Sequence, residues 1–246
     1  MLFESDRLES KLFSVEDSRS VHLQKILKVK PGDEIAIGLL NGGLGTGKIQ
    51  SVSETGIRLE ASFVSEVCSR PKTTLILAMP RPKVLRRILP ELVALGLGRI
   101  VLLRSWRVEK SYLESDVIKP EVYRPLIHHG LMQGKYTCEP EFLFEPRFRP
   151  FVEDRLDALA GDSVRLFAHP DSPASMASVS LASTREVTLA IGPEGGWVDY
   201  EIEAFENQGF QRIRLGERIL KVETACAVLM GQLELLRAQF YKNASS

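Results

Sequence analysis

Two loops in the last quarter of the chain have the residue types of a ligand site. The first, residues 191–197 (IGPEGGW), follows an apolar strand-like run and precedes a helical pattern that begins near Asp199. Glycine lets a backbone approach a ligand closely and adopt positive φ angles. Loops at the carboxyl ends of parallel strands are where open α/β sheets bind ligands. On glycine content alone, a plain tight turn between strand and helix is an equal alternative.

The second loop, residues 215–220 (LGERIL), also follows a strand-like run and leads into a helix through residues 221–225 (KVETA). Glu223 and Thr224 lie near the expected N-terminus of that helix, where an acid and a small hydroxyl suit the dipole and the free N–H groups. Neither loop holds a nucleophile–base pair, a set of metal ligands or a cluster of lysines. The pattern indicates one shared site for a cosubstrate that carries its own reactivity.

A third glycine-rich segment, residues 42–48 (GGLGTGK), fits the opening of a phosphate-binding P-loop. That motif needs a Ser or Thr next, to coordinate magnesium, and a helix after it. Ile49 occupies the Ser/Thr position, and the residues that follow alternate like a strand. We therefore expect a β-hairpin loop here rather than a nucleotide site.

The composition excludes several classes of protein. With 44% hydrophobic and 26% charged residues among 246, the chain is not generally disordered. Its three cysteines, Cys68, Cys138 and Cys226, are far apart and form no CxxC pair, so we expect neither a disulfide framework nor a metal site. No signal peptide and no membrane-spanning stretch is recognisable. These features predict a cytoplasmic protein without a membrane partner.

The charge balance is even, with 32 basic and 32 acidic residues, but residues 71–110 carry nine basic and only two acidic ones. A compact basic patch is typical of a phosphate-bearing partner, and a solvated helix face is the alternative. Within it Trp106 either stacks on a base or is buried as a core anchor, and the second is favoured. The arginines expected to contact phosphates are Arg81, Arg86, Arg87, Arg104 and Arg107.

Two domains are expected from the change of pattern along the chain. Residues 1–70 read as a small β-barrel of short alternating strands, with one helical turn near 22–27, and end in a linker at 68–71. Residues 71–246 alternate apolar strands with longer helices, which argues for an α/β domain with a parallel sheet. Pro90 should kink the first helix of this domain or start a second one. The strands expected in it are 73–79, 99–103, 164–167, 187–191 and 212–215, with later helices at 199–207 and 222–240.

The segment from Ile191 to Leu229, IGPEGGWVDYEIEAFENQGFQRIRLGERILKVETACAVL, resembles the C-terminal signature of the bacterial 16S ribosomal RNA uracil-N3 methyltransferases. These belong to the knotted SPOUT superfamily. The resemblance implies a PUA-like β-barrel domain at 1–70 and an α/β methyltransferase domain at 71–246 tied in a trefoil knot. It also implies S-adenosyl-L-methionine as methyl donor, 16S ribosomal RNA of the small ribosomal subunit as RNA-binding partner and substrate, and a homodimer.

Carried onto this chain, the resemblance places the cosubstrate in the two loops and in a third strip after the strand at 164–167. For catalysis it suggests Glu194 as the base that accepts the uracil N3 proton and Arg218 as the cation that steadies the anion. Glu194 bracing its own loop through backbone N–H groups is an equal alternative. The cofactor-binding residues expected are Phe167, Ala168, His169, Ile191, Gly192, Pro193, Gly196, Leu215, Gly216, Ile219, Leu220, Thr224 and Ala225.

Three positions depart from the family pattern. Met132 and Tyr136 stand where an acidic residue and an arginine are usual, and Lys221 stands where an arginine is common. Lys135, His128 and His129 are possible substitutes, although two histidines before Gly130 equally suit a helix end. The departures keep open an alternative function, a non-catalytic RNA-binding ribosome-assembly factor of the same fold.

The homodimer interface is expected on the C-terminal helix, where apolar residues recur at helical spacing. The same stripe suits packing against the sheet, and the resemblance favours the interface. Its members are Val222, Cys226, Leu229, Leu233, Leu236 and Phe240.

Overall fold

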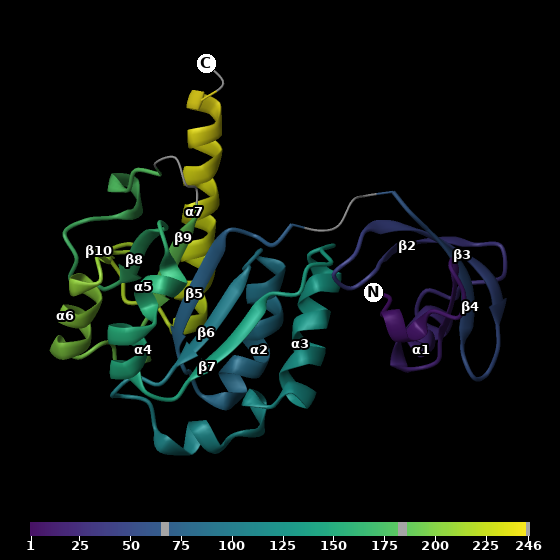
Figure 1. Ribbon diagram of the computed structural model, residues 1–246, viewed down its shortest axis with the longest axis horizontal. Coiled ribbons are helices and arrows are strands. Elements are labelled where there is room, and N and C mark those ends of the chain that lie inside the picture. Colours follow the sequence, from purple (N-terminus) through teal and green to yellow (C-terminus); the bar gives the residue numbers. More distant parts are fainter. Residues whose placement is uncertain (65–68, 182–185, 245–246) are drawn as a thin grey trace. The chain divides into compact units, whose positions relative to one another are not determined.

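The computed structural model describes residues 1–64, 69–181 and 186–244 and divides the chain into two compact units (Figure 1). One unit comprises residues 1–70 together with 131–139, and the other comprises 71–130 and 140–246. The sequence did not indicate that residues 131–139 return to the first unit. Cys68, at the start of the expected linker, lies outside the described residues.

The first unit is built on a four-stranded antiparallel sheet in the order β1-β4-β3-β2. Alternation along β4 buries Ile57, Leu59 and Ala61 on one face, where they join a core that includes Phe13 and Ile49. The strands are β1 (Leu12–Val15), β2 (Glu34–Gly38), β3 (Leu44–Val52) and β4 (Ile57–Phe63), and the helices are η1 (Glu4–Asp6) and α1 (Ser18–Lys25).

The P-loop-like segment lies in the turn before β3 and in the first half of that strand. β3 pairs with β2 from Gly38↔Leu44 to Glu34↔Lys48, so no helix follows the glycines. The hairpin prediction is confirmed. The predicted helical turn near 22–27 is instead the longer helix α1, whose N-terminus is capped by the Asp17 carboxylate accepting the N–H of Arg19.

The second unit contains a six-stranded parallel sheet in the order β10-β8-β9-β5-β6-β7, as the α/β prediction required. Its central strands are buried on both faces, which explains their unbroken apolar runs. The edge strand β7 escaped prediction because its acidic ends and half-exposed residues hide the strand pattern. The strands are β5 (Thr73–Ala78), β6 (Arg99–Leu103), β7 (Glu141–Glu145), β8 (Val164–Ala168), β9 (Val187–Ile191) and β10 (Gln211–Ile213).

The strand order decides which face each helix covers, because crossovers between parallel strands are right-handed. The chain moves one way along the sheet through α2 and α3 and the opposite way through α4, α5 and α6, so the two groups cover opposite faces. α7 joins the first group by packing against α2 (Figure 1). The helices are α2 (Pro82–Ala94), α3 (Pro120–Gln133), α4 (Phe148–Asp154), α5 (Leu156–Ala160), α6 (Asp199–Asn207) and α7 (Val222–Ala244).

Pro90 does not divide its helix, since α2 runs without a break to Ala94. Leu95 caps the C-terminus of the helix and is followed by Gly96, whose φ is 87°. An L-residue with a side chain rarely adopts that angle, which makes glycine the suitable terminator.

The connection between β8 and β9 and the end of β10 lie against each other. Ser172 Oγ donates a hydrogen bond of 2.9 Å to the carbonyl of Arg212, and the Arg214 N–H donates one of 2.8 Å to the carbonyl of Ala174. α7 contacts both β9 and the short helix η4 (Met176–Ser178) of that connection.

α7 is also fixed at the other end of the sheet. The Arg237 guanidinium donates to the hydroxyl of Thr73 at 2.7 Å and to the carbonyl of Lys72 at 3.1 Å. Thr73 begins β5 and is buried. The C-terminal helix therefore supplies hydrogen-bond donors to the start of the central strand.

The apolar stripe of α7 serves mainly this packing within one chain. Val222, Cys226, Leu229 and Leu233 are buried in the chain's own core, and only Leu236 and Phe240 are partly exposed. The stripe therefore lends little support to the expected dimer interface, which stays a prediction. Neighbouring Leu235 is exposed.

Two glycines inside helices provide a matched test of the packing. A Cβ on Gly130 of α3 would lie 2.3 Å from the Pro90 carbonyl oxygen of α2, whereas a Cβ on Gly231 of α7 meets nothing within 4 Å. We expect Gly130→Ala to lower the free energy of unfolding by about 1–3 kcal/mol through overpacking. Gly231→Ala should raise it by up to about 1 kcal/mol through helix propensity. Urea unfolding of the two variants measures both effects, and equal stabilities would contradict the close α2–α3 contact.

Candidate active site

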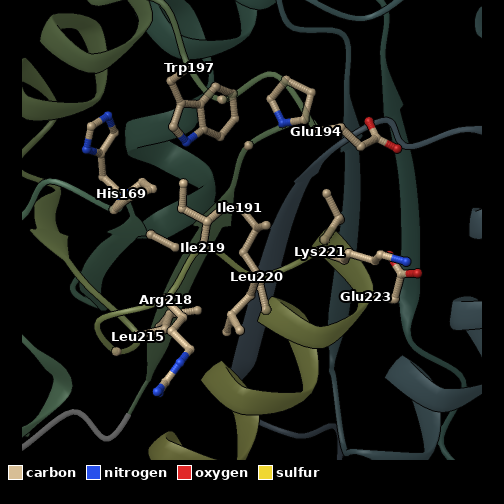
Figure 2. Close-up of a pocket in the computed structure, with 18 of the residues that line it drawn as sticks. His169, Ile191, Glu194, Trp197, Leu215, Arg218, Ile219, Leu220, Lys221 and Glu223 are labelled. Atoms are coloured by element: carbon tan, nitrogen blue, oxygen red, sulfur yellow. The ribbon is translucent and has the colours of Figure 1, made fainter.

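A cavity of about 580 Å³ lies where three neighbouring parallel strands end (Figure 2). Its walls come from the loops after β8, β9 and β10, from the first turn of α7, and from Arg81 and Val84 at the start of α2. The volume is that of a pocket for a small organic ligand. The carboxyl-end location is the one predicted from the sequence.

Most of the predicted cosubstrate residues line this cavity. They are Ala168, His169, Ile191, Gly192, Pro193, Gly196, Leu215, Gly216, Ile219, Leu220 and Ala225.

Phe167 and Thr224 do not. Phe167 is fully buried and stacks on Phe205 of α6, so its side chain belongs to the core and not to the cavity wall. Thr224 is exposed, since α7 buries Val222 and Ala225 on the opposite side of its first turn.

The two residues proposed for catalysis both border the cavity but lie apart. Figure 2 shows the Glu194 and Arg218 side chains on different sides of it, pointing away from each other. Both are exposed. In the part of the chain that the structure describes, the Glu194 carboxylate makes no hydrogen bond, so the alternative that it braces its own loop finds no support.

Glu201 instead braces the loop at residues 191–197. This residue was not predicted from the sequence. Glu201 is only 1% exposed, and its two carboxylate oxygens accept the N–H of Trp106 at 2.7 Å and of Val198 at 3.1 Å. Burial raises the pKa of Glu201 above its ordinary value. A glutamate three residues after the helix N-cap was the available signal. Its carboxylate joins the loop after β6 to the loop after β9.

Arg107 makes a second link between these loops by donating a hydrogen bond to the Gly195 carbonyl oxygen. Arg107 therefore holds the cavity loop, a role not anticipated for a residue expected to contact phosphate.

The other arginines of the basic segment are also engaged or placed differently than expected. Arg86 pairs with Asp116 and Arg87 with Glu223, each at 2.6 Å. Glu223 lines the cavity, as does Arg81. Arg104 is half-buried. The patch is thus partly neutralised by acids that stand far away in the sequence, although Arg87 and Arg86 keep exposed surface.

Trp106 is 83% exposed, so its prediction as a core anchor is wrong. A turn in which Val108 N–H donates to the Ser105 carbonyl buries Ser105 and Val108 and leaves Trp106 and Arg107 outside. The alternative, stacking on a base, stays a prediction. The backbone below the ring is held by Glu201.

Trp197 has the opposite environment, with 4% exposure in the cavity wall. Its ring packs edge-to-face with Phe205 at 5.0 Å and against Phe148 at 6.3 Å. A Cβ on Gly192 would lie 3.1 Å from the indole nitrogen, so glycine at that position leaves room for the ring.

Residues at the positions that depart from the family pattern have local roles. The Tyr136 hydroxyl donates to the Ser69 carbonyl within the first unit, and Met132 is exposed.

His128 and His129 lie inside α3, which continues to Gln133, rather than at its end. Lys221 lines the cavity. His169 accepts the N–H of Asp171 on Nδ1, a loop contact.

Within the described ranges, no group of three His, Cys, Asp or Glu is placed to hold a metal ion. Burial raises the pKa of the Cys226 thiol to about 12, which makes it an inert core residue. Among the described residues, no helix is long and apolar enough to cross a membrane.

Comparison with known proteins agrees with this architecture. Residues 68–234 match the family described as RNA methyltransferase domain, and residues 15–62 match the RNA methyltransferase PUA domain. These matches define an RNA methyltransferase with an N-terminal PUA domain.

The curated relatives narrow this class. Ribosomal RNA small subunit methyltransferase E of Treponema pallidum is 30% identical over 226 residues, covering 89% of this chain and 85% of that protein. The enzyme of the same name from Synechocystis is 28% identical, covering 87% and 70%. The chain belongs to the ribosomal RNA small subunit methyltransferase E family.

Solved structures share the fold. One is ribosomal RNA small subunit methyltransferase E from Neisseria gonorrhoeae bound to S-adenosyl methionine, with a TM-score of 0.78 at 20% identity over 95% of this chain and 96% of that one. Another is a methyltransferase from Legionella pneumophila in complex with the same cofactor, with a TM-score of 0.76 at 23% identity over 95% and 96%.

The raised pKa of Glu201 predicts a pH dependence of stability. The folded chain holds the Glu201 proton more tightly than the unfolded chain, so this group stabilises the fold progressively as the pH falls through the folded pKa toward the ordinary value of 4.5. Glu201→Gln removes that contribution. We expect the Tm of the wild type minus the Tm of the variant to increase as the pH falls from 7 to 4.5. A value of this Tm difference that decreases on acidification contradicts the assignment. Glu203→Gln, at an exposed position of the same helix, is the matched control.

Proposed function

We propose that this chain transfers the methyl group of S-adenosyl-L-methionine to N3 of a uridine in 16S ribosomal RNA of the small ribosomal subunit. Family membership supports ribosomal RNA methylation. The observation that carries the cosubstrate is the cavity itself, lined by glycine backbone, apolar side chains and a few charged groups but by no nucleophile–base pair.

The residues present fit this cosubstrate. The cavity volume suits a ligand of that size, and its lining combines apolar side chains with the charged Lys221 and Glu223. When bound, S-adenosylmethionine supplies an activated sulfonium methyl, so the chain has mainly to position it and the base. Backbone groups at Gly192, Pro193 and Leu215 and the apolar side chains of Ile219 and Leu220 provide that positioning.

The uracil N3 carries a proton and must lose it to become a nucleophile. Glu194 is exposed at the cavity border, where a base entering from RNA can reach its carboxylate. Arg218, on another side of the cavity, is placed to steady the negative charge of the deprotonated uracil (Figure 2).

The proposal includes a homodimer and a cytoplasmic location, as expected for an enzyme of ribosomal RNA. Sedimentation at micromolar concentration tests the first. The alternative, a non-catalytic assembly factor of the same fold, predicts no turnover. Mass mapping of methylated uridines in ribosomal RNA from a deletion strain and its complement separates the two.

Glu194→Gln tests the proposed base. Loss of a general base lowers kcat by roughly 10²- to 10⁴-fold, while cosubstrate affinity measured by calorimetry should stay near that of the wild type. Glu217→Gln is the matched control, because Glu217 is an exposed acid of the second loop that does not line the cavity. Full activity of Glu194→Gln would assign proton removal to another group.

RNA contacts separate into two measurable kinds. Trp106→Ala should weaken RNA binding by about 1–3 kcal/mol if the ring stacks on one base, and Trp106→Phe should restore most of that affinity.

The double change Arg86→Ala/Arg87→Ala should flatten the slope of log affinity against log salt by about 0.7–0.9 for each lost phosphate contact. Salt titrations of RNA binding measure both. Unchanged affinity and slope would leave RNA recognition to the PUA domain.

A further inference from the structure

The loops after β6 and β7 begin at the same edge of the sheet as the cavity loops. The two strands pair in parallel up to Leu103↔Glu145, and the Arg104 N–H donates to the Glu145 carbonyl at 2.9 Å. Arg104 is the first residue beyond β6, and Arg147 is the second residue beyond β7. The strand register therefore brings the starts of the two loops together.

Each of these loops carries an arginine that the fold leaves unpaired. Arg147 is exposed and Arg104 is half-buried, and neither guanidinium makes an ion pair or a hydrogen bond with any residue in the described ranges. The neighbouring Arg149, by contrast, pairs with Glu153 at 2.8 Å. Two cations without an acidic partner at one edge of the sheet favour an anionic ligand.

Trp106 lies in the same loop as Arg104 and is 83% exposed. Its backbone is nevertheless fixed, because its N–H donates to the Glu201 carboxylate at 2.7 Å and the adjacent Arg107 donates to the Gly195 carbonyl oxygen. Leaving a large aromatic ring in water forgoes the free energy of burying it. An exposed ring on a fixed backbone, with cations nearby, is typical of a platform on which an unpaired base stacks.

The platform is connected to the wall of the cavity. Arg107 contacts the loop after β9, and Phe148, next to Arg147, packs against Trp197 of the cavity wall with ring centroids 6.3 Å apart. A base stacked on Trp106 therefore belongs to a nucleotide close to the one at the cavity. Inside a duplex both faces of a base are covered by its neighbours, so only an unpaired nucleotide offers a free face.

We propose that the loops after β6 and β7 form one RNA-binding surface, which selects a target uridine that has an unpaired neighbour. Trp106 stacks on the base of that neighbouring nucleotide, and Arg104 and Arg147 contact phosphates beside it. The substrate class is single-stranded or looped RNA rather than a continuous duplex. This inference rests on the proposed function, because it takes RNA as the substrate.

Tryptophan fluorescence of the full chain tests the stacking. The chain has two tryptophans, and Trp197 is only 4% exposed, so quenching by added RNA reports on Trp106. A short oligouridylate should quench the emission of the wild type. Trp106→Phe, which retains Trp197 alone, should show no quenching. The same strand annealed to oligoadenylate should leave the emission of the wild type unchanged.

Affinities measured by the anisotropy of a labelled strand separate the ring from the cations. Trp106→Ala should bind oligouridylate roughly 5- to 140-fold more weakly, the value of stacking one base, and should bind the duplex like the wild type. Arg104→Ala and Arg147→Ala, made singly, should each flatten the slope of log affinity against log salt by about 0.7 on the single strand. Arg124→Ala, at an exposed position of α3, is the matched control and should keep the wild-type slope.

The outcomes are distinct. Oligouridylate that leaves the wild-type emission unchanged, or a duplex that quenches it equally, overturns the selection of an unpaired neighbour. Wild-type slopes in both arginine variants exclude these cations from the surface. Polyglutamate that quenches Trp106 as strongly as the RNA does would assign the surface to an acidic protein instead. Quenching by the single strand alone, together with no methylated uridine in the mapping experiment, overturns the proposed function and leaves the binding surface standing.

Discussion

The candidate site depends on one buried carboxylate. Glu201 sits in the first turn of α6 and accepts one N–H from the loop after β6 and another from the loop after β9. Burying a charge is unfavourable unless hydrogen bonds compensate it, and these two backbone donors provide the compensation. Because the bonds are made to backbone atoms, they fix the path of both loops. Trp106 on one loop and Trp197 on the other are thereby presented from a common support.

This arrangement explains how a site can be built without a conventional set of catalytic side chains. The cavity walls are mainly loop backbone and apolar residues, so their usefulness lies in shape and position rather than in reactivity. Glu201, together with the Arg107 bond to Gly195, gives the loop after β9 a definite geometry. Loops positioned by a rigid scaffold are a common location of binding residues.

The sequence predicted the part of the site that follows from local rules. Parallel strands share one carboxyl edge, so loops that follow such strands meet, and most residues of the loops at 191–196 and 215–220 indeed line one cavity. The sequence did not predict the interactions whose two partners lie far apart along the chain. Arg87 meets an acid 136 residues later, and Glu201 meets a backbone N–H 95 residues earlier. Trp106 was misjudged because apolar character alone does not show which side of a turn a residue occupies.

The tie between Arg237 and Thr73 bears on the order in which the molecule is completed. β5 is the first strand of its domain to be synthesised and lies inside the sheet, yet the residue that satisfies its buried hydroxyl is 164 positions further on. In a nascent chain the start of β5 therefore lacks this partner until Arg237 of α7 has been synthesised. Removing the final turns of α7 would therefore deprive the beginning of the domain, rather than its end, of a hydrogen-bond partner.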